Sequence, residues 1–260
     1  MCIRDRAFIP LPLPFTPGVD AAGTIIAVGR NVTGFAPGDE VMGFIGIVGA
    51  YASRIVVDPQ RLARKPESLT FTQAAAIPAA TLTAWQALHE HGELRAGQTV
   101  LIHAAAGGVG SAAVQIAKLA GARVIGTASA ANHDYIRDLG ATEVIDYRAG
   151  DFARQVSGVD LVLDLVGGDT QSRSWAVLKP GGILVSTVSK PDPPARAQAS
   201  RVAGRHFATR ADGHQLASLS AAFAAGDLRT RIDSVFPLAD ASQAMARNMA
   251  GHTQGKVVLD

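Results

Sequence analysis

Three small residues between residues 104 and 110 have the spacing of a turn that can hold a diphosphate. Ala105, Gly107 and Gly110 follow the apolar run Val100–Ile102 and precede a helix-forming run. Small residues at these positions allow a tight turn, close approach of the backbone to a diphosphate, and close packing of helix on strand. The first amides of the helix favour an anion. The turn therefore predicts a dinucleotide site, and its candidate contacts are Ala106, Gly107, Gly108, Val109 and Gly110.

The residues after the next strand bear on the choice of dinucleotide. A carboxylate about 20 residues beyond the turn would hold the ribose 2′-hydroxyl of NAD. The segment Gly126–Ala130 carries no acid, and the first one is Asp134. A 2′-phosphate is then not repelled, and Ser129 can donate to it, with His133 and Tyr147 as further donors. The alternative is that Ser129 and Tyr147 cap or pack. We expect NADP(H) as the cofactor.

The elements that must position these residues are of two kinds. Residues 7–66 are predicted to be β-rich with tight turns, with strands over 19–28, 40–47 and 51–57. Residues 69–92 are predicted to be helical, with Thr70 or Thr72 as N-cap. From Thr99 onward, strands are expected at 99–104, 123–127, 143–146, 160–166, 182–188 and 256–259, and helices at 111–120, 133–139, 175–178, 214–225 and 239–250. The continuous apolar strands predict an α/β fold with a doubly wound parallel sheet of Rossmann type.

Composition excludes several classes of function. The 260 residues are 48% hydrophobic and 18% charged, with a formal net charge of +2 and no cluster of basic residues. These values indicate a well-buried core and predict no nucleic-acid partner. We also expect no membrane partner and a cytoplasmic location, because no apolar run approaches ~18 residues and no signal peptide is recognisable. Cys2 is the single cysteine, so an intramolecular disulfide is excluded.

The first six residues, Met1–Arg6, read like a translated sequencing-library adapter joined to an open frame. We therefore expect that residues 1–6 do not belong to the fold and that the chain is a fragment.

Eight segments together resemble the zinc-independent quinone oxidoreductase branch of the medium-chain dehydrogenase/reductase superfamily, which includes alkenal (enone) reductases. The matching segments are Pro17–Gly23, Pro37–Val41, Ala74–Pro78, Leu82–Trp85, Ile102–Gly110, Leu139–Thr142, Asp164–Gly167 and Gly255–Val258. The resemblance implies a partial GroES-like catalytic domain at 7–72, a Rossmann domain at 73–226, and a return to the catalytic domain at 227–260. It also implies that strands preceding Pro17, which carry part of the cleft, are absent.

The resemblance also allows the zinc positions to be compared. Zinc-containing relatives have a histidine at the position of Val19 and a cysteine near that of Ala79. Neither valine nor alanine can ligate zinc, so we expect no metal and no metal-assisted carbonyl chemistry. Hydride transfer from the cofactor to a small-molecule acceptor, a quinone or an α,β-unsaturated carbonyl, is the activity that the resemblance implies.

By the same resemblance, Ser129, His133 and Tyr147 surround the adenosine phosphate. Further cofactor contacts are expected at Val166, Ser186, Phe207 and Thr209, and candidate cleft residues are Thr81, Thr83, Trp85 and Tyr51. Core packing explains Trp85 equally well and is the favoured explanation of Tyr51. No catalytic residue is identified, and Lys256 is expected to be a solvated edge charge. Relatives often form dimers through the edge of the Rossmann sheet, so a homodimer is a further expectation. Two alternatives stay open: an enoyl-thioester reductase of polyketide-synthase type, and a non-catalytic NADPH-binding protein.

Overall fold

The computed structural model describes residues 11–251 and 253–260, and these form two units. The parallel-sheet unit is Thr83–Thr209, and the terminal unit joins the described residues up to Leu82 to Arg210–Asp260. These limits differ from the boundaries expected after residues 72 and 226. Helix α7 (Gly213–Ala225) belongs to the terminal unit because its first residue packs directly on the backbone of Leu62, where a Cβ at Gly213 would collide with the carbonyl oxygen.

The parallel-sheet unit contains six parallel strands in the order β6-β5-β4-β7-β8-β9. Their bounds are β4 Thr99–Ile102, β5 Arg123–Ala128, β6 Glu143–Asp146, β7 Val159–Asp164, β8 Leu178–Ser186 and β9 Ala203–His206. Apolar residues of β4 and β7 are completely buried, as a sheet covered on both faces requires. The chain runs outward from β4 to β6 and then returns to β7 beside β4. The order therefore reverses between β4 and β7, which confirms the doubly wound sheet.

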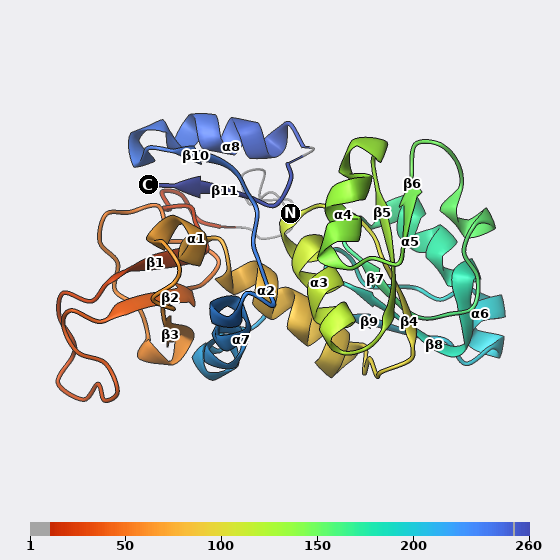
Figure 1. The fold of residues 1–260 in the computed structure, drawn as a ribbon, viewed down its shortest axis with the longest axis horizontal. Coiled ribbons are helices and arrows are strands. Elements are labelled where there is room, and N and C mark those ends of the chain that lie inside the picture. Colours follow the sequence, from red (N-terminus) through yellow and green to blue (C-terminus); the bar gives the residue numbers. More distant parts are fainter. Residues whose placement is uncertain (1–10, 252) are drawn as a thin grey trace. The chain divides into compact units, whose positions relative to one another are not determined.

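The helices of this unit follow the strands in alternation. Their bounds are α3 Gly108–Leu119, α4 His133–Leu139, α5 Gly168–Ser174 and α6 Ala195–Ala199, and a π-helix spans Gln86–His91. Helices α3 and α4 cover one face of the sheet over β4, β5 and β6 (Figure 1). The helix expected at 175–178 is wrong: α5 ends at Ser174, a 3-10 turn spans Trp175–Val177, and Leu178 begins β8. Trp175 and Val177 belong to the buried core, which explains the apolar pattern that suggested a helix.

The terminal unit holds an antiparallel sheet β1-β2-β3 and a separate parallel pair, β10 and β11. Its bounds are β1 Asp20–Thr24, β2 Glu40–Phe44, β3 Leu62–Arg64, β10 Ile232–Phe236, β11 Lys256–Leu259, α1 Phe71–Ala75 and α8 Ala241–Met249, while α2 Pro78–Trp85 crosses from one unit to the other. Thr70 is the N-cap of α1, in a reciprocal capping box with Gln73. The strand expected at 51–57 does not form: the segment takes bends and irregular backbone, without the ladder partner that a strand requires.

Candidate functional site

The turn between β4 and α3 has the geometry of an anion site. Gly107 is the N-cap of α3 and has no side chain to cap it, and the first helical hydrogen bond runs from the Ser111 amide to the Gly107 carbonyl (2.9 Å). The amides of Gly108, Val109 and Gly110 therefore precede the hydrogen-bond ladder of a helix of 12 residues. Such amides, together with the helix dipole, favour a bound anion.

The two glycines of this turn are needed for different reasons. A Cβ at Gly110 would stand 2.7 Å from Cα of Ala105, so close packing of helix on strand requires glycine there. A Cβ at Gly107 would meet nothing nearer than the Ala104 carbonyl oxygen at 3.4 Å, and its φ of −74° suits any residue. Neither packing nor backbone conformation of the protein explains Gly107. The space it leaves open fits the close approach of a diphosphate, so the turn fits a dinucleotide.

The residues expected near the adenosine phosphate follow β5 and β6, which are neighbouring strands. Ser129 directly follows β5, and its Oγ accepts a hydrogen bond from Nδ2 of Asn132 (3.1 Å). His133 begins α4, and its Nε2 is buried without a hydrogen-bond partner among the described residues. Tyr147 follows β6 and is 47% exposed.

Arg148 is a residue that sequence reasoning missed at this end of the site. Its Nε donates to the Tyr147 hydroxyl (3.2 Å), and its guanidinium lies 5.5 Å from the centre of that ring. The pair thus places a cation beside a predicted phosphate ligand. The signal was present in the sequence, because Arg148 directly follows Tyr147.

The residues expected at the opposite end of the dinucleotide differ in accessibility. Val166 is 49% exposed, whereas Ser186 is completely buried and its hydroxyl donates to Oδ2 of Asp164 (2.8 Å). Phe207 is buried and stacks on the ring of His91 with centroids 4.2 Å apart. The side chain of Ser186 is therefore enclosed by its neighbours, and sequence reasoning missed its partner Asp164, the acid at the end of an apolar strand.

Thr83 and Thr209, assigned to different parts of the site, are brought together. Their hydroxyl oxygens lie 2.7 Å apart, and Thr209 follows the carboxyl end of β9. Of the other cleft candidates, Trp85 is half-buried with its ring 5.1 Å from that of His89, and Thr81 is buried within the terminal unit.

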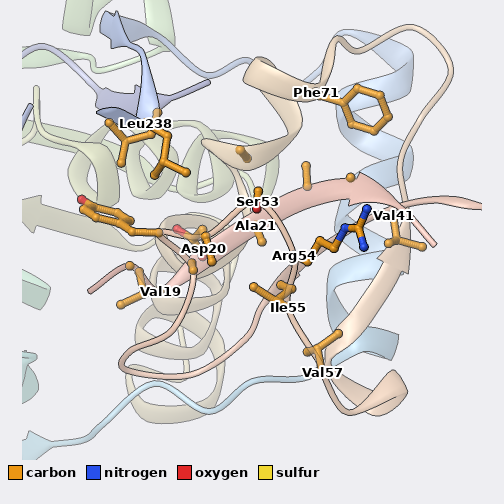
Figure 2. Close-up of a pocket in the computed structure, with 18 of the residues that line it drawn as sticks. Val19, Asp20, Ala21, Val41, Ser53, Arg54, Ile55, Val57, Phe71 and Leu238 are labelled. Atoms are coloured by element: carbon orange, nitrogen blue, oxygen red, sulfur yellow. The ribbon is translucent and has the colours of Figure 1, made fainter. Parts of the chain in front are cut away.

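Tyr51 lines a cavity of about 1460 Å³ within the terminal unit, and burial raises the pKa of its phenol. Figure 2 shows Val19 and Asp20 towards one end of this cavity and Arg54 and Phe71 towards the other. Most of the lining is apolar. The labelled lining residues are Val19, Asp20, Ala21, Val41, Ser53, Arg54, Ile55, Val57, Phe71 and Leu238.

Asp20 is the buried acid of that cavity and lies close to both positions compared with zinc-containing relatives. It directly follows Val19, and its Oδ1 accepts the amide of Ala79 (2.7 Å). Burial raises its pKa, while Lys256, with Nζ 3.4 Å from Oδ2, opposes that rise. Lys256 is therefore not a solvated edge charge. Within residues 11–251 and 253–260, no group of three or more His, Cys, Asp or Glu side chains is arranged to hold a metal ion.

Two family models match the chain: the alcohol dehydrogenase GroES-like domain over residues 2–67 and the zinc-binding dehydrogenase over 139–259. The synaptic vesicle membrane protein VAT-1 homolog of Rattus norvegicus is 34% identical over 282 residues, covering 95% of this chain and 70% of that protein. The quinone oxidoreductase structure from Coxiella burnetii has a TM-score of 0.89 and 37% identity, covering 95% of this chain and 80% of that one. The CurK enoyl reductase structure has a TM-score of 0.85 and 32% identity, covering 95% and 80%.

Proposed function

The chain belongs to the zinc-independent quinone oxidoreductase branch of the medium-chain dehydrogenase/reductase superfamily, and from this premise we propose that it is an NADPH-dependent reductase of quinones or α,β-unsaturated carbonyls. It is an oxidoreductase of a superfamily that binds nicotinamide cofactors. The preference for NADPH, the hydride transfer and the acceptor class are the proposal.

Gly107 is the observation that carries this proposal. The protein itself does not require glycine there, and the amides of Gly108, Val109 and Gly110 stand beside the space that it leaves. These amides would bind the diphosphate. The structure thus supports a dinucleotide on grounds independent of the resemblance.

Ser129, His133, Tyr147 and Arg148 would hold the 2′-phosphate. A hydroxyl, an imidazole nitrogen and a guanidinium supply donors that suit a phosphate dianion. The strand β5 ends in Ala128 and carries no acid at its end, so the carboxylate typical of an NAD site is missing there.

NADPH supplies the hydride when bound, and the protein contributes orientation. Thr83 of α2 and Thr209, which follows β9, form a hydroxyl pair that could donate to an acceptor oxygen and stabilise the negative charge developing on it. Quinones and α,β-unsaturated carbonyls suit this arrangement because their products spread that charge.

An enoyl-thioester reductase is the second candidate function, and the similarity to the CurK enoyl reductase favours it. Both functions share the cofactor and differ in the acceptor. Specificity for the thioester would reside in acceptor binding rather than in the β4–α3 turn.

One set of measurements separates these possibilities. Dissociation constants for NADPH and NADH are measured by calorimetry, and NADPH oxidation is followed with a benzoquinone, an alkenal and a crotonyl thioester. We expect NADPH to bind at least about tenfold more tightly, a difference of ~1.4 kcal/mol, and the quinone or alkenal to be reduced fastest. Preference for the thioester would establish the second candidate, and equal or tighter binding of NADH would refute the cofactor assignment.

The cellular location and the oligomeric state of the protein are also part of the proposal. The described residues contain no helix that is both long and apolar enough to span a membrane. We propose a cytoplasmic location and a homodimer formed through β9, which is the last strand on one side of the sheet.

A further inference from the structure

We propose that Asp164 is a positioning residue that fixes the loops after β7 and β8 in the arrangement that receives the nicotinamide half of the cofactor; this rests on the proposed function. Asp164 ends β7 and is completely buried. It would therefore act through its neighbours rather than by touching the cofactor.

The carboxylate of Asp164 accepts four hydrogen bonds, two on each oxygen. Oδ1 accepts the amides of Val166 (3.0 Å) and Gly167 (2.8 Å), which belong to the loop after its own strand. Oδ2 accepts the hydroxyl of Ser186 (2.8 Å) and Nε2 of Gln171 (2.9 Å). A buried carboxylate is costly unless its oxygens find donors, and these four donors satisfy it.

Ser186 extends this network into the loop after β8. It is completely buried, gives its hydrogen to Asp164, and accepts the amides of Val188 (3.1 Å) and Ser189 (3.3 Å) on the same oxygen. Gln171 adds a second link, because its Nε2 also lies 3.1 Å from Oγ of Ser189. The carboxylate of Asp164 thus fixes the backbone of the β7 loop directly and that of the β8 loop through Ser186.

The two loops also pack directly against each other. Gly167 has a φ of +79°, and a Cβ there would stand 3.0 Å from Cγ1 of Val188. Val166, between the buried Asp164 and Gly167, is 49% exposed. The network therefore holds an accessible surface in place from beneath.

The strand order indicates what that surface receives. The diphosphate turn follows β4, and the candidate 2′-phosphate ligands follow β5 and β6 on one side of it. Ligands of doubly wound sheets lie across the carboxyl ends of the strands at the point where the order reverses. The other half of the dinucleotide then extends over β7 and β8, whose loops Asp164 fixes.

Ser186→Ala tests this inference, with Ser174→Ala as its matched control. Removal of the Ser186 hydroxyl leaves the amides of Val188 and Ser189 without that acceptor and Asp164 without one donor. Ser174 is also completely buried in the same unit, and its hydroxyl bonds to His103 (2.9 Å) and to the carbonyl of Thr170 (2.6 Å). The control removes the same atom from a different network.

Two readouts are needed, one of which requires no cofactor. Amide hydrogen exchange is measured at Val166, Gly167, Val188 and Ser189, and dissociation constants are measured for NADPH and for adenosine 2′,5′-bisphosphate, which lacks the nicotinamide half. For Ser186→Ala we expect exchange in both loops to be about tenfold faster and NADPH binding to be about tenfold weaker. Binding of the bisphosphate should be unchanged, and Ser174→Ala should change none of these quantities.

The outcomes distinguish failure of this inference from failure of the proposed function. Unchanged exchange in the loops, equal weakening of both ligands, or the same effects in Ser174→Ala would each overturn the positioning role of Asp164. If the unsubstituted protein binds neither ligand, the proposed function fails, while the exchange rates still decide whether the network fixes the loops. Asp164→Asn, which keeps one acceptor oxygen, should affect the β7 loop less than the β8 loop.

Discussion

Gly110 packs so closely on Ala105 that a Cβ at Gly110 would stand 2.7 Å from Cα of Ala105, whereas Gly107, three residues earlier, has room for a side chain on the protein side. The turn thus holds one glycine that the packing of helix on strand requires and one that this packing does not require. This difference leads to the first prediction.

Gly107→Ala should weaken NADPH binding by at least about tenfold while lowering the free energy of unfolding by less than about 1 kcal/mol, because its φ of −74° suits alanine although alanine is a poorer N-cap than glycine. Gly110→Ala should instead lower the free energy of unfolding by about 1–3 kcal/mol, because the added methyl group overpacks helix on strand. Urea unfolding and calorimetric titration measure the two quantities. Unimpaired NADPH binding by the folded Gly107→Ala variant would count against a diphosphate at this turn.

Arg148→Ala should weaken NADPH binding by up to about fivefold, because exposed ion pairs contribute about 0.2–1 kcal/mol. NADH binding should be unchanged, because only NADPH carries the 2′-phosphate. Added salt should reduce the difference between variant and parent. The control is Arg137→Ala, since the guanidinium of Arg137 is already paired with Asp134 (3.1 Å). Equal weakening of NADH would show that Arg148 does not act on the 2′-phosphate.

The lowered pKa of His103 leads us to expect a loss of stability in acid. The imidazole lies between Oγ1 of Thr127 (3.1 Å) and Oγ of Ser174 (2.9 Å), and burial lowers its pKa to about 4 from 6.5. Between those two pH values the unfolded chain binds a proton that the folded protein does not, so stability falls as pH decreases. The loss attributable to His103 should reach about 3 kcal/mol at pH 4.

His103→Gln, which keeps one donor and one acceptor, is the matched variant for this titration. Its free energy of unfolding should depend less steeply on pH than that of the parent between pH 6.5 and 4. Urea unfolding at several pH values measures the two slopes. Parallel slopes would mean that His103 does not titrate in this window.

The sequence allowed the parallel sheet and the diphosphate turn to be predicted because both depend on local patterns. Apolar runs without alternation indicate buried strands, and the spacing of Ala105, Gly107 and Gly110 belongs to a single turn. The strand expected at 51–57 failed for the opposite reason. A strand needs a partner, and composition alone does not supply one.

Pairs of polar residues distant in sequence could not be predicted in the same way. Ser186 is a polar residue at the end of an apolar strand, which suggests a ligand contact. The register of β7 with β8 instead places it opposite Asp164 and buries its hydroxyl. Lys256 likewise stands in a short strand near the end of the chain, where a charged residue is expected to face solvent. Its partner Asp20 is 236 residues away in the chain. Such contacts follow from the packed fold rather than from any segment.

The pair of Asp20 and Lys256 yields the last prediction. Burial raises the pKa of Asp20, so the folded protein holds a proton there more tightly than the unfolded chain and loses stability as pH rises above about 3.8. Lys256 opposes the rise in this pKa and so reduces the loss at neutral pH. Lys256→Met should therefore lower the free energy of unfolding by about 3–5 kcal/mol at pH 7, because it leaves a buried carboxylate without its cation. The cost should shrink as pH falls and the carboxyl group becomes protonated.

Adding Asp20→Asn to Lys256→Met should restore most of the stability at pH 7 and remove the pH dependence of the single variant, as urea unfolding would measure. If the double variant is as unstable as Lys256→Met at pH 7, the lysine acts through packing of its aliphatic chain rather than through the charge of Asp20.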